Sequence, residues 1–151
     1  MTQALIPKAD PPLGRILSSL GKGYLHLLRA KLQHLDIDRN YYALVLIESQ
    51  EGTITQQELA LLLETDKVSV VRVVDYLSDK GYVNRVRKTD DRRKHSLVLT
   101  EKAKKALPQI KKSFTEINAL VQKGLESYQI SQLSETISKI KSNITENIQI
   151  Q

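Results

Sequence analysis

The sequence predicts a mainly helical α+β fold in which two short helices run directly into a β-hairpin. The first short helix begins at the capping motif Thr55-x-x-Glu58, and the second follows closely and ends at Gly81. Two β-compatible segments come next, separated by a polar and basic stretch. Together these elements form a winged helix-turn-helix, which places one element in the major groove of DNA and another beside it.

The length and composition favour a single domain, residues 1–151, with a substantial core. No apolar run approaches the ~20 residues that span a membrane, and the N-terminus lacks the apolar segment of a secretion signal. The chain has no cysteine, which excludes a disulfide framework and a thiolate metal site. We therefore expect a cytoplasmic protein with no membrane partner.

Positive charge is concentrated around the predicted hairpin. The formal net charge is +6, and a basic protein attracts phosphate backbones, although the same charge also serves solubility. The basic residues of this window are Arg85, Arg87, Lys88, Arg92, Arg93, Lys94, Lys102, Lys104 and Lys105.

Two helices are expected before the helix-turn-helix. From Leu13 to Leu35, apolar residues recur at steps of three and four, which predicts one long helix after an extended arm. Asp38 is placed to cap a second helix over Tyr41–Ser49. The residues expected to face inward from it are Tyr42, Val45 and Leu46, with Leu44 as a further candidate.

The two short helices have clear local signals. In the capping box, the Thr55 and Glu58 side chains each satisfy an orphan amide of the new helix. The expected packing residues of that helix are Leu59, Leu62 and Leu63. Asp66 or Thr65 caps the second helix. Its inward stripe, at positions i, i+3, i+4 and i+7, is Val70, Val73, Val74 and Leu77.

The hairpin strands are expected at about Tyr82–Arg87 and His95–Leu99, with residues 88–94 as a loop. Thr100 caps a long helix to about Gly124, and Pro108 within it either kinks the helix or is tolerated. A last helix begins near Ser131. Its apolar face is Leu133, Ile137, Ile140, Ile144 and Ile148.

The long apolar stripes of the terminal helices exceed what a small winged domain needs for its own core. Such a surface is usually buried against a partner, and the simplest partner is a second copy related by two-fold symmetry. We assign residues 1–35 and about 101–151 to dimerisation and about 36–100 to the winged helix-turn-helix. A two-fold dimer would place two recognition helices one DNA turn apart.

The residues in and after the second short helix read Arg72-Val-Val-Asp75-x-Leu77-x-x-Lys80-Gly81-Tyr82-Val83, followed by Asp91-Arg92-Arg93 and Leu99-Thr100. This set, in this order and spacing, resembles the MarR (multiple antibiotic resistance regulator) family of winged-helix transcription factors. The resemblance covers essentially the whole chain. It implies a bacterial homodimer in which the first, fifth and sixth helices interlock, the fourth helix enters the major groove and the wing reaches the minor groove. Lys88 departs from the family pattern, which often has an Asp there.

The outward face of the second short helix is expected to contact DNA. Near its start, Lys67 and Ser69 are candidate phosphate donors, together with free backbone amides. Arg72 has the fork geometry to pair with guanine or clamp a phosphate, and Val68 and Val71 suit thymine methyl groups. The alternative is an ordinary solvated helix face.

The hairpin supplies the second group of expected DNA contacts: Arg85, Arg87, Asp91, Arg92, Arg93 and Lys94. Arg93 would enter the minor groove, where narrow A·T-rich stretches concentrate negative potential, and Asp91 would orient it. The alternative is a solvated turn held by an Asp–Arg pair.

Many members of the resembled family lose DNA when a small, often phenolic or lipophilic, compound binds. The resemblance places an effector cleft between the dimer region and the winged domain, and the residues that could approach it are Tyr24, His26, Tyr41 and Tyr42. Tyrosines offer a ring and a hydroxyl to an aromatic acid, but they are equally suited to helix packing. Without cysteine, a thiol-oxidation switch is excluded.

The sequence offers no pattern typical of a metal site, a cofactor site or an enzyme. His26 and His34 are two helical turns apart, and His95 lies far along the chain. The leading interpretation is a homodimeric, sequence-specific regulator of a pseudo-palindromic operator, a repressor released by a small aromatic or lipophilic effector. The alternatives are a winged-helix protein–protein module and a nonspecific architectural DNA-binding protein. A strong preference for one duplex over scrambled DNA would separate them.

Overall fold

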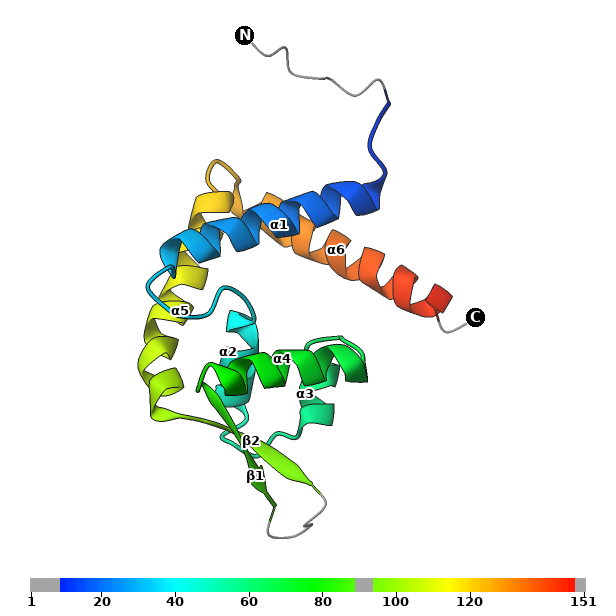
Figure 1. The fold of residues 1–151 in the computed structure, drawn as a ribbon. Helices are drawn as coiled ribbons and strands as arrows, with labels where there is room; N and C mark the ends of the chain where they lie inside the picture. The colour runs from blue at the N-terminus through cyan, green and yellow to red at the C-terminus, as the bar shows by residue number, and fades with distance from the viewer. Residues whose placement is uncertain (1–8, 89–93, 149–151) are drawn as a thin grey trace. The chain divides into compact units, whose positions relative to one another are not determined.

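The computed structural model describes residues 9–88 and 94–148. In this part of the chain, six helices accompany one two-stranded antiparallel sheet (Figure 1), which confirms the predicted fold class. In chain order they are α1 (Leu13–Lys31), α2 (Tyr41–Ser49), α3 (Gln56–Leu62), α4 (Lys67–Asp79), β1 (Val83–Arg87), β2 (His95–Leu99), α5 (Glu101–Val121) and α6 (Ser127–Ile148). The chain divides into two compact units, residues 1–115 and 116–151.

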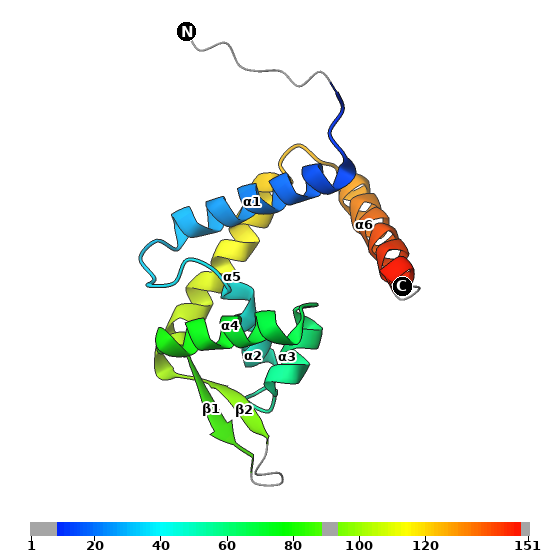
Figure 2. The same ribbon diagram turned by 45° about the vertical axis from the view of Figure 1, so that its right-hand side comes forward.

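The first unit contains the winged helix-turn-helix. Figures 1 and 2 both show α4 beside α2 and α3, with the β1–β2 hairpin projecting next to them. The inward stripe of α4 is largely as predicted, since Val70, Val74 and Leu77 are buried and Val73 is half-buried. Other large side chains fully buried in this unit are Leu32, Leu44, Ile47, Leu59, Tyr82, Leu97, Leu107 and Ile110.

The buried face of α2 differs from the expected one. Tyr42 is 54% exposed, Val45 and Leu46 are half-buried, and Leu44 and Ile47 are fully buried. The expectation of an inward Tyr42 is wrong because α2 is apolar around most of its circumference, so the sequence pattern alone does not select one face.

The predicted capping role of Asp38 is also wrong. The residue before α2 is Asn40, in the left-handed conformation with φ of 64°, and no side chain caps the helix. The Asp38 carboxylate instead accepts a hydrogen bond from the Tyr76 hydroxyl of α4 at 2.7 Å. A contact 38 residues away along the chain therefore takes the side chain that a local rule assigns to a cap.

The start of α3 is confirmed in detail. The Thr55 amide donates to Glu58 Oε2 at 2.7 Å, and the Glu58 amide donates to Thr55 Oγ1 at 3.3 Å. Leu59 is buried, but Leu62 is 44% exposed, so its predicted packing role is wrong. At the end of α4, Gly81 has φ of 75°, which is the left-handed conformation expected of a helix-ending glycine.

The hairpin matches the predicted strands to within one residue. Its antiparallel register pairs Val83 with Leu99 at the base, and β2 is also joined to the segment before α3, where the Leu97 amide donates to Ile54 O at 2.8 Å. Val83, Leu97 and Leu99 are buried. The wing is therefore anchored both to α4 through the chain and to the start of α3 through backbone hydrogen bonds.

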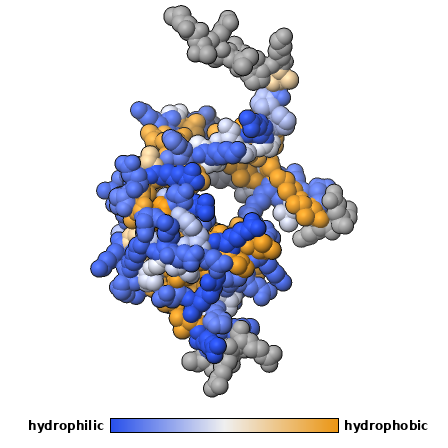
Figure 3. Space-filling view, in the orientation of Figure 1, coloured by the Kyte–Doolittle hydropathy of each residue, from blue (hydrophilic) through white to orange (hydrophobic). Residues whose placement is uncertain are grey.

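The first and last helices, α1 and α6, carry exposed apolar side chains. α1 ends at Lys31 rather than Leu35, and its exposed residues include Leu13, Ile16, Leu17 and Leu20. α6 begins one turn earlier than predicted, and Figure 3 shows apolar side chains along it. Its exposed apolar residues include Leu133, Ile137, Ile144 and Ile148. None of the described helices is long and apolar enough to cross a bilayer.

Candidate nucleic-acid interface

The outward face of α4 combines exposed valines with charged side chains. Val68 is 61% exposed and Val71 is 39% exposed, although Val70 and Val74 on the opposite face are buried. Val68, Val71, Arg72 and Asp75 follow the i, i+3, i+4, i+7 spacing of one helical stripe. A helix that exposes methyl groups beside an arginine can contact both thymine methyl groups and guanine in a major groove.

The first turn of α4 is closed by its own cap. Asp66 Oδ1 accepts hydrogen bonds from the amides of Val68, at 2.9 Å, and Ser69, at 2.8 Å. The Ser69 hydroxyl donates to Asp66 Oδ2 at 2.6 Å, and this bond is the largest cause lowering the Asp66 pKa. The expectation of free amides at this end is therefore wrong for Val68 and Ser69, because the capping carboxylate occupies them. Lys67 is exposed at the same end.

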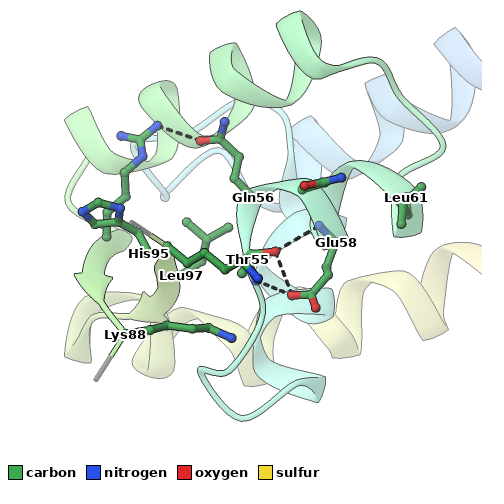
Figure 4. A pocket seen from close by; sticks show the side chains of 10 residues that line it. Thr55, Gln56, Glu58, Leu61, Lys88, His95 and Leu97 are labelled. Atoms are coloured by element: carbon green, nitrogen blue, oxygen red, sulfur yellow. Dashed lines mark hydrogen bonds between the residues drawn. The ribbon is translucent and has the colours of Figure 1, made fainter. Parts of the chain in front are cut away.

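Arg85 links β1 to both α3 and α4. Its Nη2 atom donates to Asp75 Oδ1 on α4 at 2.5 Å and to Gln56 Oε1 on α3 at 3.2 Å. Figure 4 shows the second bond at the edge of the pocket. Both bonds use one terminal nitrogen of the guanidinium. Arg85 therefore joins β1 to α4, and Gln56 is a contact that sequence reasoning missed because no local signal marks it.

A cleft of about 560 Å³ lies between α3 and the hairpin, and its lining reaches the outer end of the described strands (Figure 4). The side chains that line it include the basic residues Arg85, Lys88, Lys94 and His95. The acidic residue in the lining, Glu58, is held by the capping box. Hydrogen bonds from the Thr55 amide and hydroxyl, followed by the charges of Lys88 and Lys94, lower the pKa of Glu58. The permanent cations outnumber the carboxylate, so the cleft attracts anions such as phosphate.

The outer end of the described hairpin is also basic. Arg87 on β1 lies opposite His95 on β2, and the Lys88 amide donates to Lys94 O at 2.9 Å. The predicted wing residues Asp91, Arg92 and Arg93 lie outside the described residues. Two basic residues, Arg87 and Lys88, therefore precede that segment in the sequence, and two more, Lys94 and His95, follow it.

The four candidate effector residues lie in different surroundings. Tyr41 is 2% exposed, and its hydroxyl donates to Ile37 O at 3.1 Å. Tyr42 is exposed and packs edge-on against Phe114, with ring centroids 6.3 Å apart. Tyr24 is half-buried, which raises its pKa, and His26 is exposed. Tyr41 has a core packing role, while the effector role of all four residues stays a prediction.

The described residues hold no group of three or more His, Cys, Asp or Glu side chains arranged to bind a metal ion.

The chain resembles known proteins in both sequence and structure. The sequence model of the MarR family matches residues 39–95, which run from the start of α2 to the start of β2. The crystal structure of the transcriptional regulator SlyA superposes with a TM-score of 0.81 at 22% identity, covering 91% of this chain and 96% of that one.

Two further solved structures are more similar in sequence. A MarR transcriptional regulator from Methanosarcina mazei Go1 has 27% identity and a TM-score of 0.74, with 89% of this chain and 96% of that one covered. A mutant MarR from E. coli, complexed with operator DNA, has 26% identity and a TM-score of 0.76, covering 85% and 93%.

Proposed function

The chain belongs to the MarR family of winged-helix proteins, and from that premise we propose that it binds double-stranded DNA and regulates transcription. The observation that carries the proposal is the exposed stripe of Val68, Val71 and Arg72 on α4, beside a cleft lined by basic side chains. The E. coli relative complexed with operator DNA supports it.

In the proposed complex, α4 enters the major groove. Arg72 pairs with guanine or a phosphate, the two valines contact thymine methyl groups, and Lys67 contacts the backbone. The Ser69 hydroxyl donates its hydrogen to Asp66 in the helix cap. It can therefore donate to a DNA phosphate only if it turns away from Asp66. The basic cleft lies beside α4, and its lysines Lys88 and Lys94 are proposed to contact phosphates of the adjacent DNA backbone. Arg93 of the wing, oriented by Asp91, is proposed to reach the minor groove, with Arg92 adding phosphate attraction and Arg87 a further DNA contact.

The proposed active form is a homodimer on a pseudo-palindromic operator. The exposed apolar residues of α1 and α6 support it, because monomeric proteins rarely leave such stripes in contact with water. A two-fold dimer matches an inverted repeat, since each protomer reads one half-site.

We further propose a cytoplasmic repressor that a small aromatic or lipophilic compound releases from DNA. Because the chain has no cysteine, release would depend on non-covalent binding that favours a dimer with the wrong spacing of its recognition helices. Tyr24, His26, Tyr41 and Tyr42 are the candidates for contacting that compound.

The experiment selects bound fragments from sheared genomic DNA with the wild type and with Arg72→Ala at near-physiological salt. The control Lys139→Ala removes an equal charge from an exposed position of α6. We expect the wild type and the control to recover an inverted repeat that the Arg72 variant recovers much less efficiently. Recovery of the same random fragments by all three proteins would contradict sequence-specific regulation. A steep salt dependence without preference would then favour architectural binding, and weak DNA binding overall would favour a protein partner.

A further inference from the structure

The segment between α1 and α2 holds the C-terminal end of α4 through two tyrosine–aspartate pairs. The Tyr76 hydroxyl donates to Asp38 Oδ1 at 2.7 Å and accepts from the Asp38 amide at 3.0 Å. The Tyr82 hydroxyl donates to Asp36 Oδ1 at 2.8 Å. Two residues of one short segment therefore bind two tyrosines, one in the last turn of α4 and one three residues after its end.

A cation completes each pair. The Arg39 guanidinium lies 4.5 Å from the centroid of the Tyr76 ring, and Lys102 Nζ lies 4.6 Å from that of the Tyr82 ring. Lys102 Nζ also donates to Asp36 Oδ2 at 2.6 Å and to Lys80 O at 2.7 Å. The second pair therefore joins the interhelical segment, the end of α4 and the first turn of α5.

The first pair continues into α1. Arg29, in the last turn of α1, donates from Nε to Asp38 O at 2.7 Å, and its Nη2 lies 3.9 Å from Asp38 Oδ2. A chain of hydrogen bonds therefore runs from α1 through Asp38 to Tyr76 in α4. It lies within the first compact unit.

These contacts contribute orientation more than stability. The carboxylates of Asp36 and Asp38 are about half exposed, and ion pairs and hydrogen bonds in such settings stabilise a fold only modestly. Hydrogen bonds are directional, however, and two of them at one end of a helix restrict how it tilts and rotates. The attachment of α4 to the fold comes from Val70, Val74 and Leu77, which are buried.

We propose that Tyr76 and Tyr82 are positioning residues that fix α4 relative to α1 and so set the half-site spacing that the dimer accepts. The inference rests on the proposed function as a dimeric DNA-binding regulator. In a two-fold dimer that uses α1, the direction of α4 relative to α1 determines the separation of the two recognition helices. Neither tyrosine touches DNA in this arrangement, and each acts through the helix that does.

The test compares the wild type with Tyr76→Phe/Tyr82→Phe, which removes the two hydroxyls and keeps both rings. The control Tyr128→Phe removes a hydroxyl from a 68% exposed tyrosine of α6. Each protein is titrated against duplexes in which the selected half-sites are moved apart one base pair at a time over about one helical turn. A duplex with a single half-site and the thermal unfolding midpoint are measured in parallel.

We expect the wild type and the control to prefer one spacing sharply. The double variant should bind that spacing about tenfold more weakly, because a smaller fraction of dimers holds both helices correctly. Its affinity for neighbouring spacings and for a single half-site should change less than about twofold, so that the spacing profile flattens. If the double variant does not fold, the single variants Tyr76→Phe and Tyr82→Phe carry the same comparison.

An unchanged spacing profile would overturn the inference and leave the proposed function intact. An equal loss of affinity at every spacing and at the single half-site, together with a lower unfolding midpoint, would also overturn it, because that pattern indicates a structural role alone. If the wild type showed no preference for an inverted repeat, both the inference and the proposed function would fail.

Discussion

Asp75 on α4 accepts a hydrogen bond from Arg85 on the first wing strand, with 2.5 Å between Oδ1 and Nη2. The same nitrogen reaches Gln56 at the start of α3. One guanidinium therefore joins both helices of the helix-turn-helix to the wing. Arg85 was expected to contact DNA, and in the free protein it holds together the elements that are proposed to do so.

We expect Asp75→Asn to fold normally and to bind operator several-fold more weakly, because Arg85 loses its charged partner and the wing loses its fixed direction. In a double-mutant cycle with Arg85→Ala, the coupling free energy of unfolding should be no more than about 1 kcal/mol, since the pair is partly exposed. Operator titrations and urea unfolding measure the two effects. Equal operator affinity of Asp75→Asn and the wild type would show that the pair does not orient the wing.

Lys67→Ala should weaken binding to all duplexes by a similar factor and reduce the salt slope of log K by about 1, as expected for the loss of one phosphate contact. Titrations of operator and scrambled duplex at several salt concentrations measure both quantities. Lys139→Ala, an exposed lysine of α6, is the matched control. A loss confined to the operator would instead assign Lys67 to base recognition.

The stability of the fold should decrease at acidic pH through Asp36 and Asp38. Hydrogen bonds from Lys102 and then Tyr82 lower the pKa of Asp36, and the hydrogen bond from Tyr76 lowers the pKa of Asp38. Because both pKa values are lower in the folded than in the unfolded protein, their contribution is present above about pH 4 and is lost as the pH falls through the folded values. Asp36→Asn/Asp38→Asn should therefore show a flatter decrease of the urea midpoint below pH 4. Parallel curves for the two proteins would exclude these carboxylates as the source.

Gly81→Ala should lower the free energy of unfolding by about 1–2 kcal/mol, because the residue has φ of 75° and a Cβ is disfavoured there. A Cβ at this position meets no atom within 4 Å, so the cost comes from the backbone conformation alone. Asp79→Ala, in the same turn and exposed, should change the free energy by no more than about 0.5 kcal/mol. A Gly81→Ala protein as stable as the wild type would mean that the helix end relaxes to another conformation.

The parts of the fold that the sequence predicts well are those with local causes. Thr55 and Glu58 are three residues apart and cap α3 as expected, and the valines of α4 fix its buried face by their spacing. The strands follow from β-compatible residues on either side of a polar stretch. Each of these features depends on neighbours within about one or two helical turns.

The features that escaped prediction depend on distant partners. Tyr82 and Asp36 are 46 residues apart, and Arg85 and Gln56 are 29 apart, so no local pattern reveals either contact. Asp38 has the residue type of a cap but binds Tyr76, and α2 is too uniformly apolar for its periodicity to select a face. The exposed stripe of α4 was predictable because burial of one face leaves the other to solvent. The spacing of the valines did not reveal the hydrogen bond from the Ser69 hydroxyl to Asp66.

The most direct test of DNA recognition by α4 is the ratio of affinities for the selected operator and a scrambled duplex, measured for the wild type, Arg72→Ala and Lys139→Ala. At near-physiological salt, the wild type and Lys139→Ala should both prefer the operator by at least about 10³-fold. Arg72→Ala should lose about 10- to 100-fold of operator affinity, the value of one arginine–guanine pair, with a much smaller loss on the scrambled duplex. An equal ratio for all three proteins would contradict the assignment of α4 as the recognition helix.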